Sequence, residues 1–237
     1  MIVSFTCIVN KAEYLIMAYF LCYSVPMNLH RLIILCSAIL LSVSCTSTDT
    51  ASKYPAMLAD IEPFSLGAVS ASLDRSFSSK ERDTDVEVFL HPRQNEVELN
   101  FTNGISYFRQ FWNQEARECF IRAHEKYKED FAGGQLINKQ YKTRAVYGKA
   151  KGRFLWKTMA VSPVYRASPG FEFGYRFRNG EPFLTVYQKA ADEENKTSSE
   201  GIKQSPQYYL YFTPAQSEDL VRYFDQAFLL WAVGGMK

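Results

Sequence analysis

The stretch FEFGYRFRNGEPFLTVYQK (171–189) constrains the fold of this chain more than any other segment. Two runs of alternating apolar residues flank Asn179-Gly180, the pair typical of a two-residue type I′ turn. Such a turn fixes the register of both strands, and the register here separates apolar pairs from polar or mixed pairs. The apolar surface pairs Phe177 with Pro182, Tyr175 with Leu184 and Phe173 with Val186, and the opposite surface pairs Arg178 with Glu181, Arg176 with Phe183 and Gly174 with Thr185. The segment therefore predicts an antiparallel hairpin.

Further strands are expected where short runs of β-branched and aromatic residues lie between polar loops. The segments are 57–74, 86–90, 96–101, 145–161 and 207–212. The loop HPRQN separates 86–90 from 96–101 and predicts a second hairpin.

A first helix is predicted over residues 105–131, because apolar residues recur there every three or four positions. The stripe consists of Ile105, Phe108, Trp112, Ala116, Cys119, Phe120, Ala123, Tyr127 and Phe131. Thr102 or Asn103 can cap its start and Gly133-Gly134 can end it. Cys119 lies on this stripe, so we expect a packing residue rather than a reactive thiol.

A second helix is predicted after Thr213, which is followed by Pro214 at the first helical position and by Gln216 in capping-box spacing. Its stripe consists of Leu220, Tyr223, Phe224, Ala227 and Trp231, and Gly234-Gly235 ends it. These elements predict an α+β fold, with an antiparallel sheet of about six to seven strands and two long amphipathic helices packed on one face.

The region before this body has the layout of an export signal. Arg31 supplies a positive charge, and Leu32 to Val43 is a 12-residue run without charge. Such a run is too short to span a bilayer as a helix, which takes about 20 residues. Small residues and Cys45 follow, and then a polar stretch, TSTDTASK.

The stretch LSVSC (41–45) resembles the lipobox of bacterial lipoproteins. Ser42 stands where the family usually has Leu, and that Leu is found one place earlier, at Leu41. The resemblance covers residues 27–45 and implies that the Cys45 thiol carries a diacylglycerol, that the chain is cut before it, and that the new amino group is acylated. It also implies a bacterial cell-envelope protein, anchored to a membrane on its periplasmic or surface face. The alternatives are an uncleaved signal anchor and a buried strand that ends in Cys45.

The expected organisation follows from this reading. We expect residues 1–26 to be a non-native upstream extension, because a start at Met27 makes a complete signal; the alternatives are a genuine long signal and a helical hairpin in the membrane. Residues 27–44 are the signal peptide, 45–56 a Ser/Thr-rich flexible tether, and 57–237 a single α+β domain. Cleavage would leave two cysteines in the mature chain, and acylation of one excludes an intramolecular disulfide.

No catalytic, cofactor-binding or metal-binding residues are predicted. Cys119 and His124 lie about 140° apart around a helix, so they cannot form a pair from one face. Zinc-ligand spacings, a Gly-x-Ser-x-Gly elbow and a phosphate-binding loop are all missing from the sequence. We therefore expect a protein that is not an enzyme and needs no cofactor.

One basic region stands out, because no acidic residue occurs between Asp130 and Glu172. Alternation places four of its cations on one face of the expected strand 145–161, with aromatic residues interleaved. These candidate anion-binding residues are Lys149, Lys151, Arg153 and Lys157. Their partner would be an anionic lipid, an acidic glycan or an acidic protein surface. The alternative is a solvated face, balanced by acidic loops elsewhere, since the net charge is only +2.

The sequence thus predicts a lipid-anchored envelope lipoprotein with a non-catalytic binding or scaffolding domain and no nucleic-acid partner. One alternative is a cytosolic protein that binds nucleic acid through the basic aromatic sheet. Another is an enzyme with an unfamiliar site at Glu172, Arg176 and Tyr187.

Overall fold

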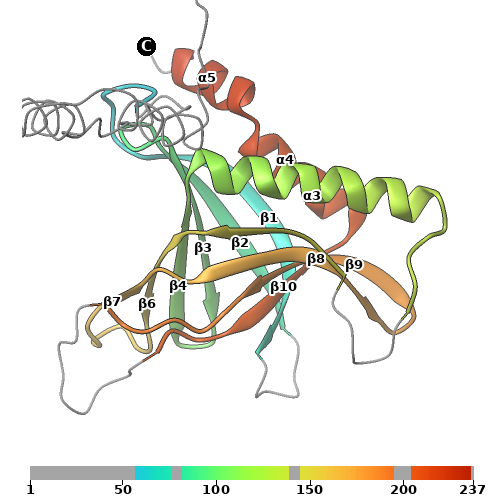
Figure 1. Ribbon diagram of the computed structural model, residues 1–237. Coiled ribbons are helices and arrows are strands. Elements are labelled where there is room, and N and C mark those ends of the chain that lie inside the picture. The colour runs from blue at the N-terminus through green and yellow to red at the C-terminus, as the bar shows by residue number, and fades with distance from the viewer. Residues whose placement is uncertain (1–56, 76–81, 139–144, 195–203, 236–237) are drawn as a thin grey trace, which may run out of the picture. The chain divides into compact units, whose positions relative to one another are not determined.

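The computed structural model describes residues 57–75, 82–138, 145–194 and 204–235 (Figure 1). These residues belong to one compact unit, Ser52–Lys237, and contain ten strands and three helices. The strands are β1 (Phe64–Arg75), β2 (Arg82–His91), β3 (Glu96–Asn103), β4 (Ser106–Trp112), β5 (Ala145–Lys151), β6 (Arg153–Lys157), β7 (Tyr165–Ala167), β8 (Gly170–Arg178), β9 (Glu181–Gln188) and β10 (Tyr208–Phe212). The helices are α3 (Gln114–Ala132), α4 (Pro214–Phe224) and α5 (Gln226–Gly234).

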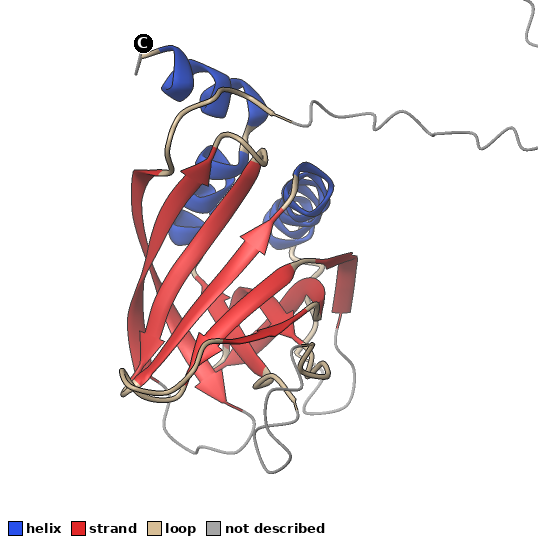
Figure 2. Ribbon diagram, turned by 90° about the vertical axis from the view of Figure 1, so that its left-hand side faces the viewer, coloured by secondary structure: helices blue, strands red, loops and turns tan. Residues whose placement is uncertain are grey.

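All these strands join in one sheet, in the order β5-β8-β9-β10-β1-β2-β3-β4-β6-β7. Every neighbouring pair is antiparallel. The sheet curls around its own core, and helices α3 and α4 pack against each other and against its inner face (Figure 2). We call inner the face that carries buried apolar side chains such as Val88 and Phe173, and outer the face that carries Glu98 and Tyr209.

The ring of Trp112 joins both helices to the sheet. Its centroid lies 5.1 Å from Phe171 and 5.2 Å from Phe173 on the sheet. It also lies 5.8 Å from Phe120 of α3 and 4.9 Å from Phe224 of α4. Aromatic contacts at such distances add to the free energy gained by burial, so Trp112 is the centre of the core.

A polar network crosses the inner face, and its members satisfy one another. The Gln110 amide nitrogen donates to Gln188 Oε1 (3.0 Å) and to the Tyr208 hydroxyl (2.8 Å). The Tyr208 hydroxyl in turn donates to Gln188 (2.8 Å), and the Trp112 indole donates to Gln110 Oε1 (3.2 Å). Because buried polar groups cost free energy only when they are unpaired, this network is tolerated in the core.

Gly152 lets one chain segment run from one edge of the sheet to the other. It stands between β5, the first strand of the order, and β6, the last but one. A Cβ at this position would lie 2.5 Å from the Phe171 ring and 2.6 Å from the Phe111 carbonyl oxygen. The backbones approach so closely here that only glycine fits.

The hairpin predicted around Asn179-Gly180 is confirmed. Strands β8 and β9 pair in the expected register, from Arg178 opposite Glu181 to Phe173 opposite Val186. Both turn residues have positive φ, 51° and 88°, as a type I′ turn requires.

Several helix ends are also confirmed. The Thr213 hydroxyl accepts from Gln216 N, and Gln216 Oε1 accepts from Thr213 N, which completes a capping box with Pro214 in the first turn. Gly133 caps the end of α3. Cys119 packs against the core, where its thiol donates to the Lys149 carbonyl at 3.4 Å.

The predicted fold class is wrong. In place of six to seven strands with two long helices on one face, the described residues form a ten-stranded curled sheet with three shorter helices. Part of the error is at 105–112, which was expected to begin the first helix and instead belongs to the turn before β4 and to β4 itself. Phe108 and Trp112 fit a helical stripe, but they also fit a period of two, with Ser106 and Gln110 facing inward beside them. Tertiary pairing with β3 and β6 decided between the two periods.

The other errors have local causes. The expected second helix breaks at Asp225, whose extended backbone (φ −65°, ψ 126°) ends α4 while its carboxylate accepts from Phe228 N (2.8 Å) to begin α5. The expected single strand 145–161 is split between β5 and β6 at Gly152. Neither break is marked in the sequence by a proline or by a run of polar residues.

Candidate functional site

The four predicted anion-binding residues lie on the outer face, but they do not form one group. Lys149 and Lys151 belong to β5, whereas Arg153 and Lys157 belong to β6. The strand order separates these two strands, although Gly152 joins them in sequence.

The first group of cations, Lys149 and Lys151 on β5, lies among carboxylates. Glu172 on β8 lies 2.7 Å from Lys189 Nζ and 3.6 Å from Lys149 Nζ. These residues line a hollow of about 440 Å³ together with Lys151 and Glu115 of α3. Three lysines therefore face two carboxylates, and the excess positive charge is small.

The second group, Arg153 and Lys157 on β6, lies beside cations from the neighbouring strands. We call this larger group the basic surface. It consists of Arg109 on β4, Arg153 and Lys157 on β6, and Arg166 on β7. The register places Leu155 opposite both Arg109 and Arg166, so the three side chains form one row across the strands. Three of the cations line an open depression of about 560 Å³ with His91 and Glu96.

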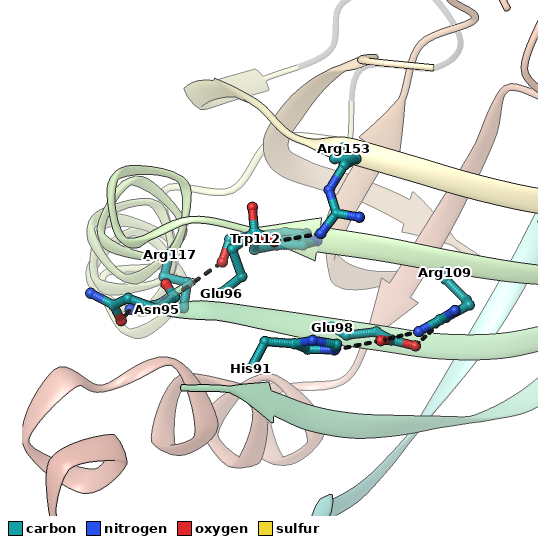
Figure 3. A network of polar contacts seen from close by, with 8 residues as sticks. All are labelled: His91, Asn95, Glu96, Glu98, Arg109, Trp112, Arg117 and Arg153. Atoms are coloured by element: carbon teal, nitrogen blue, oxygen red, sulfur yellow. Dashed lines mark hydrogen bonds and ion pairs between the residues drawn. The ribbon is translucent and has the colours of Figure 1, made fainter. Parts of the chain in front are cut away.

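Glu98 is a buried carboxylate beneath this surface (Figure 3). Its side chain is 4% exposed, and its oxygens accept from Arg109 Nε (2.5 Å) and Nη2 (2.7 Å). His91 Nε2 lies 2.7 Å from the same carboxylate. Burial opposes ionisation of Glu98, but the hydrogen bonds from His91 and Arg109 and the charge of Arg109 outweigh it, so the pKa of Glu98 lies below its usual value. The hydrogen bond to Glu98 raises the pKa of Arg109 in return.

Arg153 lies over the ring of Phe111. Its guanidinium carbon is 3.7 Å from the ring centroid, and its Nη2 is 2.6 Å from Glu96 Oε2. His91 contacts the same ring edge-on at 5.3 Å. Phe111 is consequently only 2% exposed, so this ring is covered by charged side chains rather than open to a ligand.

Of the aromatic residues that were expected to interleave with the basic ones, Tyr141 lies outside the described residues, and the other three are not on the basic surface. A bulge between Val146 and Gly148 reverses the alternation, so that Tyr147 points inward and its hydroxyl donates to Asp130 of α3 (2.7 Å). Trp156 is part of the core, and Tyr165 stacks on it at 5.4 Å.

A second aromatic group lies on the outer face of β9 and β10 and is also covered by arginines. Its members are Phe183, Tyr187, Tyr209 and Tyr211. Arg176 lies 4.5 Å from the Tyr209 centroid, and Arg178 lies 4.3 Å from that of Tyr211. Burial raises the pKa of Tyr211. This group is therefore packed surface, held by cation–π contacts.

The residues of the expected enzyme alternative do not enclose a substrate site. Glu172, Arg176 and Tyr187 line a hollow of only about 10 Å³, roughly the space of one water molecule. Among the residues that the structure describes, no group of three or more His, Cys, Asp or Glu side chains is placed to hold a metal ion.

Sequence reasoning missed Arg109, Glu98 and His91. Alternation along 86–101 could have placed His91 and Glu98 on one face, but Arg109, the cation on the other side of Glu98, comes from a strand that was predicted as helix. Arg166 was within the basic region, and only the pairing of β6 with β7 brings it beside Arg109.

A comparison with protein families gives one match, over residues 63–230, to a family described as "Uncharacterised Treponema protein". The chain belongs to this family. No curated protein and no solved structure matches the chain. The matched range covers β1 to most of α5, that is, the body that carries the basic surface.

The N-terminal predictions lie outside the described residues. They are the extension 1–26, the signal 27–44, the lipid attachment at Cys45 and the tether 45–56. Within the described ranges, no helix combines the length and the apolar content that a bilayer crossing requires.

Proposed function

We propose that this protein is a lipoprotein of the bacterial cell envelope, anchored to a membrane through acylated Cys45, with a non-catalytic body that binds or scaffolds an anionic partner. The lipobox-like LSVSC supports the anchor. The arrangement of Arg109, Arg153, Lys157 and Arg166 on adjoining strands supports the binding role, and it is the observation that carries it.

Charge on the basic surface favours an anion because its four cations exceed its two carboxylates, each of which is paired with one of the arginines, so that the charges of Lys157 and Arg166 are left in excess. Glu98 is buried under Arg109 and His91, and Glu96 is paired with Arg153. Arg109 and Arg166 are two strands apart, roughly 10 Å at the usual strand spacing. A partner with closely spaced negative groups, such as an acidic glycan, a lipid headgroup layer or an acidic protein surface, matches such a row.

The nucleic-acid alternative has one open ring beside the basic surface, Tyr107, which is 43% exposed with Lys157 Nζ 5.5 Å from its centroid, whereas the other outer-face rings described above are covered. Single-stranded nucleic acid is held by aromatic rings on which bases stack. Phe111 is covered by Arg153 and His91, and Tyr209 and Tyr211 are covered by Arg176 and Arg178.

The binding role is tested with the detergent-solubilised lipoprotein and sulfated dextran, with neutral dextran of equal length as the control ligand. Arg166→Glu should weaken binding about tenfold at low salt, since reversing one exposed charge in contact with an anion removes about 1.4 kcal/mol. The matched control is Arg122→Glu on the exposed side of α3. Equal binding of neutral dextran, or equal effects of the two variants, would refute the role.

The anchor is tested independently by mass spectrometry of the native product and by phase partitioning. We expect acyl chains on Cys45 and partition of the protein into the detergent phase. Cys45→Ala should carry no acyl chain and should remain joined to Ser44, because in lipoproteins the cut follows lipid attachment. An unmodified Cys45 still joined to Ser44 would exclude the anchor.

A further inference from the structure

Helix α5 leaves an apolar face uncovered. Leu229 and Val233 are buried against the body, whereas Trp231 is 73% exposed and Leu230 is 52% exposed. Ala227 is also exposed and precedes them by one helical turn. These three residues form the α5 face.

The α5 face lies at the end of the body where the chain arrives from Cys45. Leu58 N donates to the Pro92 carbonyl (2.8 Å) in the β2–β3 turn. The buried Arg117 then joins that turn to α5, because its Nη2 lies 2.9 Å from Asn95 Oδ1 and 2.7 Å from Oε1 of Gln226, the first residue of α5. Figure 1 shows α5 at the end of the sheet opposite the β3–β4 turn.

The length of chain outside the structure keeps this end near the anchor. Met57 is the twelfth residue after Cys45, and a fully extended chain of that length spans at most about 40 Å. Its average extension as a flexible linker is only about 20 Å. If Cys45 is acylated, the α5 end is therefore the part of the described body that meets the bilayer most often.

The chemistry of the α5 face suits a lipid interface. Tryptophan is enriched at the boundary between headgroups and acyl chains, and small apolar helix faces bind there without spanning the bilayer. Charge near this end is mixed, since Asp225 caps α5 while Arg222 lies over the Phe228 ring at 5.8 Å. Apolar contact, rather than lipid charge, would hold the helix.

A second copy of the chain is a poorer occupant. Three exposed side chains of this size offer roughly 300 Å² per copy, and a stable interface usually buries about 1,200 Å² or more in total.

We propose that α5 lies in the headgroup–acyl boundary of the bilayer that holds Cys45, with Ala227, Leu230 and Trp231 in contact with lipid. This inference rests on the proposed anchor. It fixes the orientation of the body, so that the β3–β4 turn with the exposed Ile105 points away from the membrane.

The chain offers a direct probe, because Trp231 is exposed while its two other tryptophans, Trp112 and Trp156, are buried. The acylated protein is reconstituted in neutral phosphatidylcholine vesicles with and without brominated acyl chains. The fluorescence of Trp231 is the difference between the wild type and Trp231→Phe. Brominated lipid should quench most of this fluorescence, and iodide in the water should not quench it. In the Trp231→Phe background, Ile105→Trp should show the reverse pattern.

The outcomes separate the inference from the anchor. A protein that floats with vesicles while Trp231 is quenched by iodide and not by bromine keeps its anchor and overturns the α5 contact. A protein that does not float overturns the anchor, and the inference with it. Shielding of Trp231 from iodide in lipid-free protein that begins at Thr46, together with a dimer in sedimentation, assigns the face to a second copy and also overturns the inference.

Discussion

Replacing Glu98 by Gln tests whether its charge, rather than its shape, holds the outer face together. The substitution keeps the volume, removes the negative charge and replaces one of the two acceptor oxygens by an NH2 donor. Glu98 accepts two hydrogen bonds from Arg109 and contacts His91 at 2.7 Å. A hydrogen bond to a charged group contributes about 1 kcal/mol more than a neutral one, which gives an upper value of about 3 kcal/mol for three contacts. Arg109 is 44% exposed, so solvent screening reduces the expected loss to about 2 kcal/mol.

The assay is urea unfolding of both proteins between pH 7 and pH 3. The pKa of Glu98 is lower in the folded protein than its ordinary value of 4.5, so the unfolded chain takes up its proton first as the pH falls. Its stabilisation is therefore complete above pH 4.5, decreases as the pH falls from there toward the folded pKa, and is lost below the folded pKa. The difference between wild type and Glu98→Gln should accordingly shrink toward zero at the acidic end. The control is Glu87→Gln on the exposed outer side of β2, which should change the unfolding free energy by less than about 0.5 kcal/mol. A difference that stays constant with pH would refute the argument from charge.

Two further predictions concern the breaks that divide the chain into its elements. Gly152→Ala should lower the unfolding free energy by about 3 kcal/mol in urea titrations, because the added methyl group meets the Phe171 ring and a backbone oxygen. The control is Gly234→Ala, whose methyl group meets nothing within 4 Å. Equal effects of the two substitutions would contradict the close approach at Gly152. Asp225→Ala should cost about 1 kcal/mol by removing the cap of α5 and should speed amide exchange in α5 while leaving α3 unchanged. Unchanged exchange in α5 would show that Asp225 does not hold the helix.

The sheet could be predicted only where its strands are neighbours in sequence. The β8–β9 register follows from Asn179-Gly180 because turn geometry and side-chain alternation act over a few residues. The segment 105–112 carries apolar residues that suit a helix as well as a strand. Gln110 breaks the expected alternation of apolar and polar residues, since it is a polar residue at an inward position. It is tolerated there because its amide is paired with Gln188 and Tyr208, which are far away in the sequence. A local pattern cannot reveal a buried polar residue whose partners are non-local.

The candidate site shows the same limit. The sequence placed Arg153 and Lys157 in a basic region, but it grouped them with Lys149 and Lys151, from which Gly152 separates them. Arg109, Arg166 and the buried Glu98 join Arg153 only through the pairing of β3, β4, β6 and β7.

The sequence by itself determined the β8–β9 hairpin, the capping box at Thr213 and the end of α3 at Gly133, because each depends on backbone sterics and on hydrogen bonds between residues close in the chain. Only the tertiary structure decided how many strands the sheet has, where the long segments break and which charges meet on the outer face. Those outcomes depend on contacts between residues dozens of positions apart, and such contacts exist only once the sheet has curled around its core.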